Sequence, residues 1–336
     1  MTGTRRATPT AYRVLPADAP REQWLATRRQ GLGSSDVAAV LGVDERKSAL
    51  HVYYDKIGQL PEEDAGEAAM WGNILEEPVA REWCRRNKTS STRVGVVVRL
   101  NEPWMLCTLD RLVDRCPLLT PPIDRSSQRC ALEVKTRNAW VAGKWRGGVP
   151  DDVHAQVAWQ MAVTGYDHVH IAVLIGGQEF RQFTVRRDPG LEETIVERAA
   201  LFWHANVQFL LPPPSDEVDP DQVIGLENSL YPDRTGSIEV NVLETWERVT
   251  SYQLAGIREK EAKNEKAKAK AWLIGQLHGA EVATVDGEKV YDYTPTTRSN
   301  VDLERLRERW PEAYDECVTE SSSPTFRLSP KYTWKR

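Results

Sequence analysis

The stretch CALEVKT, residues 130–136, decides how the rest of this sequence is interpreted. Leu132 and Val134 are typical of a buried β-strand, whereas Glu133 and Lys135 interrupt it two positions apart. Side chains two positions apart leave a strand on the same face. Burying an acid and a base on that face is costly unless other groups pair with them. The neighbouring sequence should therefore supply a partner.

A divalent cation is such a partner, and the strand before this one carries a second acid. Asp110 lies in WMLCTLDRLVD, near the end of an apolar strand that we expect to pair antiparallel with CALEVKT. Mg²⁺ prefers carboxylate oxygens, and phosphodiester hydrolysis needs an activated water and neutralised phosphate charge. Asp110 and Glu133 would then bind one Mg²⁺, with the backbone carbonyl of Val134 as a further ligand. Lys135 would face the attacking water or the phosphate.

A third acid comes from the helix expected over AAMWGNILEEPVAREWCRRN, in which Pro78 should lie within the first turn or two. Glu76 and Glu77 are both candidates. Glu76 shares a helix face with Trp83, which should be the buried side. Glu77 lies four residues before Arg81, a spacing that suits a solvent-exposed ion pair. We therefore prefer Glu76.

A plainer alternative needs no metal. Glu133 and Lys135 would form an ion pair on an edge strand, and Asp110 would cap a turn. The tripeptide Glu-x-Lys is common, so by itself it favours this alternative. The upstream Asp at a strand end and the upstream helical acid favour the metal site instead.

The order of helices and strands along the chain predicts an α/β fold, a central mixed sheet flanked by helices. The prolines and acids of LPPPSDEVDPD cannot continue a helix and mark a boundary. Beyond it come a long charged helix and a hairpin around the Asp-Gly turn at 286–287. The expected parts are a flexible N-terminal tail (1–20), a nuclease-like domain (21–211), a linker (212–235) and a C-terminal helix and hairpin extension (236–336).

Composition narrows the class of protein. The 336 residues are 40% hydrophobic with a net charge of −5, which argues against coating nucleic acid through bulk charge. No run approaches the roughly 18 apolar residues of a membrane span, and we expect a cytoplasmic protein, in a bacterial host cell if it is phage-encoded. The five cysteines show no CxxC pair, so we expect no disulfide framework, zinc ribbon or iron–sulfur cluster. We interpret His168 and His170 as structural.

Five motifs, in this order, resemble those of the YqaJ-like viral recombinase family. They are RRQGLGSSDVAAVLGV, WGNILEEPVAREW, CTLDRLVD, ALEVKT, and HAQVAWQMAVTG followed by HVHIAVLIGG. This is the phage exonuclease group that includes bacteriophage lambda exonuclease, within the PD-(D/E)xK nuclease superfamily. The resemblance covers roughly residues 21–190.

The resemblance implies a restriction-endonuclease-like core and a Mg²⁺-dependent deoxyribonuclease, with Mn²⁺ as a substitute. Such an enzyme degrades double-stranded DNA from 5′ ends and leaves 3′ single-stranded tails. By motif, Asp110 and Glu133 resemble metal ligands, Lys135 the catalytic lysine and Glu76 an additional acid. Gln156 resembles the glutamine that follows the catalytic strand.

The first motif resembles a pocket for the terminal 5′ phosphate. Arg29, or alternatively Arg28, and Ser35 resemble the residues that hold this phosphate, and Ser34 is a further candidate. An arginine fork, a hydroxyl and free backbone N–H groups at a helix start suit a phosphate. A plain helix cap with a solvated arginine pair is the alternative. Asp36, beside Ser35, adds negative charge there and could instead orient the arginines.

Further DNA contacts are expected from the loop after the catalytic strand and from Gln160. The loop residues are Arg137, Lys144, Trp145 and Arg146, although a solvated loop is equally compatible with them. The resemblance implies DNA ends as substrate, a single-strand annealing protein as partner and a homo-oligomer, with a ring as one form. An endonuclease of the same fold and a catalytically silent DNA-binding or assembly module are the alternatives.

Overall fold

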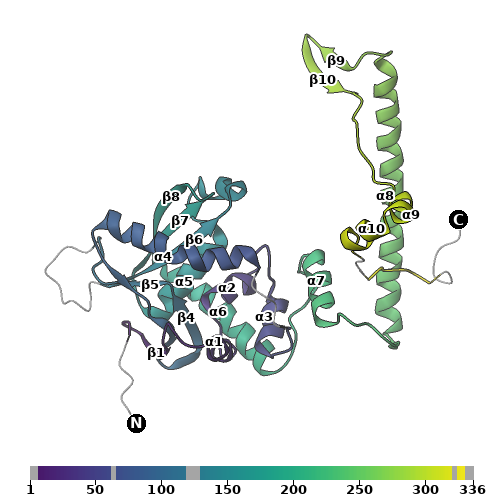
Figure 1. The fold of residues 1–336 in the computed structure, drawn as a ribbon. Helices are drawn as coiled ribbons and strands as arrows, with labels where there is room; N and C mark the ends of the chain where they lie inside the picture. The colour runs from purple at the N-terminus through teal and green to yellow at the C-terminus, as the bar shows by residue number, and fades with distance from the viewer. Residues whose placement is uncertain (1–6, 62–65, 119–128, 320–323, 330–336) are drawn as a thin grey trace. The chain divides into compact units, whose positions relative to one another are not determined.

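The computed structural model describes residues 7–61, 66–118, 129–319 and 324–329 (Figure 1). The chain forms two compact units, Met1–Arg234 and Thr235–Arg336. The acidic motifs all belong to the first unit, and the long charged helix and the hairpin belong to the second.

A five-stranded mixed sheet lies at the centre of the first unit. Its order is β2 (Ser91–Thr92), β5 (Arg111–Val113), β6 (Cys130–Arg137), β7 (His168–Ile175) and β8 (Glu179–Arg186). β6 and β7 are parallel, and the other neighbours are antiparallel. Together with the flanking helices, this confirms the fold class predicted from the sequence.

A second sheet places β3 (Gly95–Arg99) between β1 (Ala11–Leu15) and β4 (Glu102–Leu109). β1 corrects the expectation of a loose tail over residues 1–20, because Ala11–Leu15 pairs antiparallel with β3. The single strand expected around Asp110 is divided in two. β4 belongs to the second sheet and β5 to the first, so the chain changes sheets at Asp110.

Two helices cover the two faces of the five-stranded sheet (Figure 1). α5 (Asp151–Thr164) packs in a core cluster with the β6 and β7 side chains of one face, among them Ala131 and Ile171. α4 (Glu67–Asn87) packs with the opposite face, where its Trp83 belongs to a separate cluster with Leu132. Strand alternation explains the division, because successive side chains of β6 point to opposite faces.

The remaining helices of the first unit are short. They are α1 (Arg21–Arg28), α2 (Ser34–Val40), α3 (Ala49–Lys56), a 3-10 helix (Ala139–Trp145), α6 (Pro189–Leu201), a π-helix (Phe202–Gln208) and α7 (Pro220–Leu230). α7 occupies much of the segment expected to be a linker. Its side-chain cap, Asp219, accepts hydrogen bonds from Asp221 and Gln222. The expectation for Pro78 is wrong, because α4 begins about three turns before it.

The second unit contains α8 (Val242–Gln276), the hairpin β9 (Val282–Val285) and β10 (Glu288–Asp292), α9 (Leu303–Arg309) and α10 (Pro311–Cys317). Asp286 and Gly287 have φ values of 54° and 85°. Positive φ at both central residues is what a two-residue hairpin loop requires. None of the described helices, α8 included, combines the length and apolar character needed to cross a membrane.

Gly31 holds the segment before α2 against β4. The neighbouring Leu32 donates its N–H to the carbonyl of Trp104 at 2.7 Å and accepts from the N–H of Leu106 at 3.0 Å. A Cβ atom on Gly31 would lie 2.3 Å from the same Trp104 oxygen. Only glycine therefore allows the two backbones to approach this closely.

We expect Gly31→Ala to lower the free energy of unfolding of the full chain by about 1–3 kcal/mol, because two backbone segments must separate. Urea unfolding followed by tryptophan fluorescence measures it. The control is Gly143→Ala, where a Cβ would meet nothing within 4 Å. Equal stabilities for the two variants would contradict the close-approach argument.

Candidate active site

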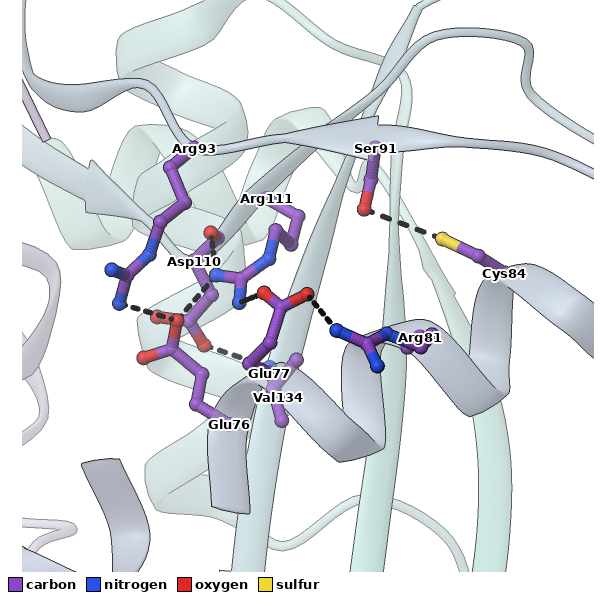
Figure 2. Close-up of polar contacts among 9 residues, drawn as sticks. All are labelled: Glu76, Glu77, Arg81, Cys84, Ser91, Arg93, Asp110, Arg111 and Val134. Atoms are coloured by element: carbon purple, nitrogen blue, oxygen red, sulfur yellow. Dashed lines mark hydrogen bonds and ion pairs between the residues drawn. The ribbon is translucent and has the colours of Figure 1, made fainter. Parts of the chain in front are cut away.

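Asp110 lies between β4 and β5, opposite the middle of β6. Arg111 pairs with Leu132 across the antiparallel β5–β6 ladder, which brings Asp110 beside Glu133. The Oδ2 atom of Asp110 accepts a hydrogen bond of 2.8 Å from the backbone N–H of Val134 (Figure 2). The antiparallel approach of the two acidic strands, expected from the sequence, is therefore confirmed.

The Glu133 carboxylate is buried and accepts hydrogen bonds from three side chains. Its Oε1 atom accepts from Lys135 Nζ at 2.5 Å and from Gln156 Nε2 at 2.6 Å. Its Oε2 atom accepts from Gln160 Nε2 at 2.7 Å. Lys135 also donates to Gln156 Oε1 at 2.7 Å, which closes a ring of three side chains. α5 supplies both glutamines one helical turn apart.

The electrostatic surroundings of Asp110 are unfavourable to its charge. Burial raises the pKa of Asp110 well above its usual value, and the negative charge of Glu133 raises the pKa further. Lys135 acts in the opposite direction, while Glu76 adds to the repulsion. The attraction of Lys135 therefore does not offset the effects of burial and of the two neighbouring carboxylates on Asp110.

Arg111 binds both helical acids that the sequence left as alternatives (Figure 2). Its Nη1 atom donates to Glu76 and its Nη2 atom to Glu77, the latter at 2.7 Å. Glu77 also accepts from Arg81 at 3.3 Å, the surface pair that the spacing predicted. The Glu76 side chain is 19% exposed and that of Glu77 56% exposed. Glu76 is thus the more enclosed of the two acids.

The first motif builds a second polar group around Arg28. Its Nη2 atom donates to Asp36 Oδ1 at 2.8 Å and to Ser35 Oγ at 3.3 Å, and its guanidinium lies over the Trp24 ring. Asp36 thus orients Arg28, as the sequence suggested for this acid. The residue before α2 is Gly33, whose N–H donates to Asp36 Oδ2 at 2.8 Å. Ser34 and Ser35 therefore lie in the first turn of α2 and not at its cap position.

A buried lysine completes this group. Lys56 in α3 donates to Asp36 Oδ2 at 2.6 Å and to the carbonyl of Arg28 at 3.0 Å, and its side chain is 0% exposed. Burial alone would raise the pKa of Asp36. The positive charges of Lys56 and Arg28 outweigh it and hold that pKa well below its usual range.

One cleft of about 1400 Å³ connects the two groups. Arg28, Ser34 and Ser35 line one part of it. The other part is lined by the residues of the acidic group and its helix partners, namely Glu76, Asp110, Glu133, Val134, Lys135 and Gln156. Arg29 is not among the lining residues.

The structure separates the expected DNA contacts into three kinds. Arg137 and Lys144 line the cleft, and Lys144 pairs with Glu45 at 2.5 Å. Arg146 is exposed but lies outside the lining. Trp145 is 2% exposed and Gln160 is 1% exposed. Trp145 also lines the cleft, where it packs against Phe183, and Gln160 donates to Glu133. A DNA contact stays a prediction for both residues.

Sequence reasoning missed two cations that organise the site, Arg111 and Lys56. Arg111 directly follows Asp110, and apolar residues lie before and after this pair in WMLCTLDRLVD. The burial of Arg111 could therefore have been inferred. The sequence around Lys56 contains no comparable indication that this lysine is buried. Its burial depends on α3 packing beside α2, which helical periodicity does not indicate.

Comparison with known proteins gives a family. Residues 23–167 match the YqaJ-like viral recombinase domain. This stretch of the chain is similar to that domain. YqaJ of Bacillus subtilis (strain 168) is 25% identical over 313 residues, which cover 92% of this chain and 94% of that protein.

Solved structures of exonucleases are also similar to this chain. An alkaline exonuclease (LHK-Exo) from Laribacter hongkongensis is 19% identical, with 56% of this chain and 95% of that chain covered and a TM-score of 0.45. A phage-related exonuclease from Haemophilus somnus 129PT is 14% identical, with 54% and 95% covered and a TM-score of 0.39.

The depressed pKa of Asp36 predicts a pH-dependent contribution to stability. A carboxyl whose pKa is lowered by folding stabilises the folded state above its unfolded pKa of about 4. That contribution disappears as the pH falls toward the folded pKa. We expect Asp36→Asn to cost about 3 kcal/mol at pH 7, because it leaves Lys56 buried without its anion. The difference from wild type should shrink below about pH 4.

Urea unfolding across this pH range measures both effects. Asp55→Asn is the matched control, since Asp55 also approaches Lys56, at 3.5 Å, but its side chain is 32% exposed. We expect that control to change stability little. A cost for Asp36→Asn that is equally large at the lowest pH would rule out the ion pair as its source.

Proposed function

We propose that this chain is a metal-dependent deoxyribonuclease that degrades double-stranded DNA from 5′ ends and leaves 3′ single-stranded tails. The observation that carries the proposal is the cleft that joins Asp110, Glu133 and Lys135 to the Arg28 and Ser35 pair. The first group has the composition of a hydrolytic centre and the second that of a phosphate site.

The acidic group suits a divalent cation. Two carboxylates lie together in a buried place, where burial first and then the charge of Glu133 raise the pKa of Asp110. Asp110 Oδ1 has no hydrogen-bond partner among the described residues, and Glu133 Oε2 accepts one bond only. Both atoms keep lone pairs for a ligand bond. We propose Mg²⁺, with Mn²⁺ as a substitute, and the Val134 carbonyl and Glu76 as further contributors.

A bound Mg²⁺ would supply charge neutralisation on the phosphate and a more acidic water. Lys135 acts beside it as a fixed cation. An ammonium group has three donors, of which Glu133 and Gln156 take two. The third donor has no partner among the described residues and can orient a water or a phosphate oxygen in the cleft. Gln156 keeps the ammonium in place by accepting one bond from it while donating another to Glu133.

The Arg28 group is the proposed anchor for the terminal 5′ phosphate. Arg28 is held by Asp36 and Trp24, so little conformational freedom remains to be lost when an anion binds. The Ser35 hydroxyl, 3.3 Å from the guanidinium, adds a second donor. An annealing protein as partner and a homo-oligomer, ring or otherwise, remain predictions that rest on the resemblance.

We expect Lys135→Met and Glu133→Gln each to reduce DNA hydrolysis by about 10²–10⁴-fold, the range for losing a positioned catalytic group. Release of a 5′ label as mononucleotide from linear duplex DNA measures the rate, in buffer with and without Mg²⁺. Arg85→Gln on the exposed side of α4 is the control for surface charge and should keep full activity.

Closed circular duplex DNA distinguishes the alternatives. An enzyme that starts at ends leaves it intact, whereas cleavage of the circle would favour the endonuclease of the same fold. If the wild-type chain hydrolyses neither substrate with Mg²⁺ or Mn²⁺, the proposal fails and a catalytically silent DNA-binding module takes its place.

Arg28 should set the preference for phosphorylated ends. We expect Arg28→Ala to lower the ratio of rates on 5′-phosphorylated and 5′-hydroxyl duplexes by about 10-fold or more, because a charge-assisted hydrogen bond of roughly 1.5–3 kcal/mol is lost. Arg29→Ala is the matched control, since Arg29 does not line the cleft. A larger change for Arg29→Ala than for Arg28→Ala would overturn the assignment.

A further inference from the structure

Four metal-binding side chains meet on the face of the sheet opposite the acidic group. They are Cys116, Cys130, His168 and His170, here called the Cys/His cluster. Cys130 begins β6, and the two histidines lie two positions apart on β7, so their side chains share a face. Glu133 and Lys135 point to the other face. The cluster is therefore separate from the proposed catalytic site.

The ligand atoms are already close together. All four lie within 4.8 Å of one another. Cys116 Sγ is 3.0 Å from His168 Nε2 and 3.5 Å from His170 Nε2. Ligands held at 2.0–2.3 Å around one tetrahedral Zn²⁺ stand roughly 3.3–3.8 Å apart. Only small shifts are needed to reach that geometry.

The surroundings fix the orientation of the His170 imidazole. His170 Nδ1 lies 2.9 Å from Thr184 Oγ1, which leaves Nε2 directed at Cys116. The ring of Trp83 lies 5.0 Å from that of His170. An outer partner on the second ring nitrogen is typical of metal-binding histidines.

We propose that the Cys/His cluster binds one structural Zn²⁺ ion. Two thiolates and two imidazoles are a zinc ligand set, and four protein ligands leave no open position for substrate. All four residues are at most 6% exposed, which excludes solvent from the ion. The oxygen ligands of the acidic group suit Mg²⁺ instead.

The position of the ion suggests what it stabilises. Cys116 and Cys130 stand at the two ends of the segment that joins β5 to β6, and Val113 of β5 pairs with Cys130 at the start of β6. A bound ion would fix the first residue of β6 to β7. Glu133 lies three positions further along the same strand, so the ion would also restrain the strand that carries the acid.

The test is the metal content of the full chain, without reference to activity. We expect about one Zn²⁺ per chain by mass spectrometry after desalting. Cys130→Ser should lose it. Cys84→Ser is the matched control, because Cys84 is a buried cysteine of the same apolar cluster that bonds Ser91 instead (Figure 2). The Cys84→Ser variant should retain one Zn²⁺ per chain.

A wild-type measurement covers the case in which Cys130→Ser does not fold. Co²⁺ bound by thiolates gives a sulfur-to-cobalt charge-transfer band, which oxygen ligands cannot produce. We expect this band in the wild-type chain, and its loss on adding Zn²⁺. A wild-type chain that retains no Zn²⁺ after loading, or that binds Co²⁺ without the band, would overturn the proposal.

Thiol counting tests a disulfide as the competing explanation. With zinc bound, all five cysteines should react in denaturant without reductant. A Cys116–Cys130 disulfide would leave three reactive thiols, since two of the five would be oxidised, and this result would also overturn the proposal.

Discussion

The buried carboxylate of Glu133 is the constraint on which the site depends. An ionised carboxylate removed from water is expensive unless charged and hydrogen-bonded partners replace the solvent. Three donors do so here, Lys135 from the same strand and two glutamines from α5. These bonds hold α5 in register with β6. The helix that covers the sheet and the residues that would do chemistry are therefore fixed by the same contacts.

The two faces of β6 carry different kinds of side chain. Toward α5 it presents Glu133 and Lys135, and toward α4 it presents Cys130, Leu132 and Val134. Parallel pairing with β7 on one edge and antiparallel pairing with β5 on the other leave it central. A strand enclosed in this way tolerates polar side chains only where they form hydrogen bonds. Glu133 and Lys135 both do so, with each other and with Gln156.

The parts of the fold and of the site that were predictable are those that follow from the local pattern of apolar and polar residues. Two-residue alternation in CALEVKT gave the faces of the strand, and the apolar run before Asp110 gave its antiparallel neighbour. Features that need tertiary placement were not accessible. Cys130 and His168 are adjacent only because β6 and β7 pair in parallel after a helical crossover. No spacing rule for metal ligands covers that arrangement, so the sequence alone did not indicate that Cys116 and Cys130 lie together with the two histidines.

The charges of the cleft indicate where a cation would be needed most. Glu133 is paired with Lys135, and Glu76 is paired with Arg111 and Arg93. The Asp110 carboxylate accepts a hydrogen bond from the backbone N–H of Val134. Within the part of the chain that the structure describes, it forms no ion pair. Burial and two neighbouring carboxylates make its charge unfavourable. Since lysine and arginine side chains already pair with Glu133 and Glu76, Asp110 is the group whose charge a bound divalent ion would stabilise most. The fold places Asp110 where the two sheets meet at the cleft.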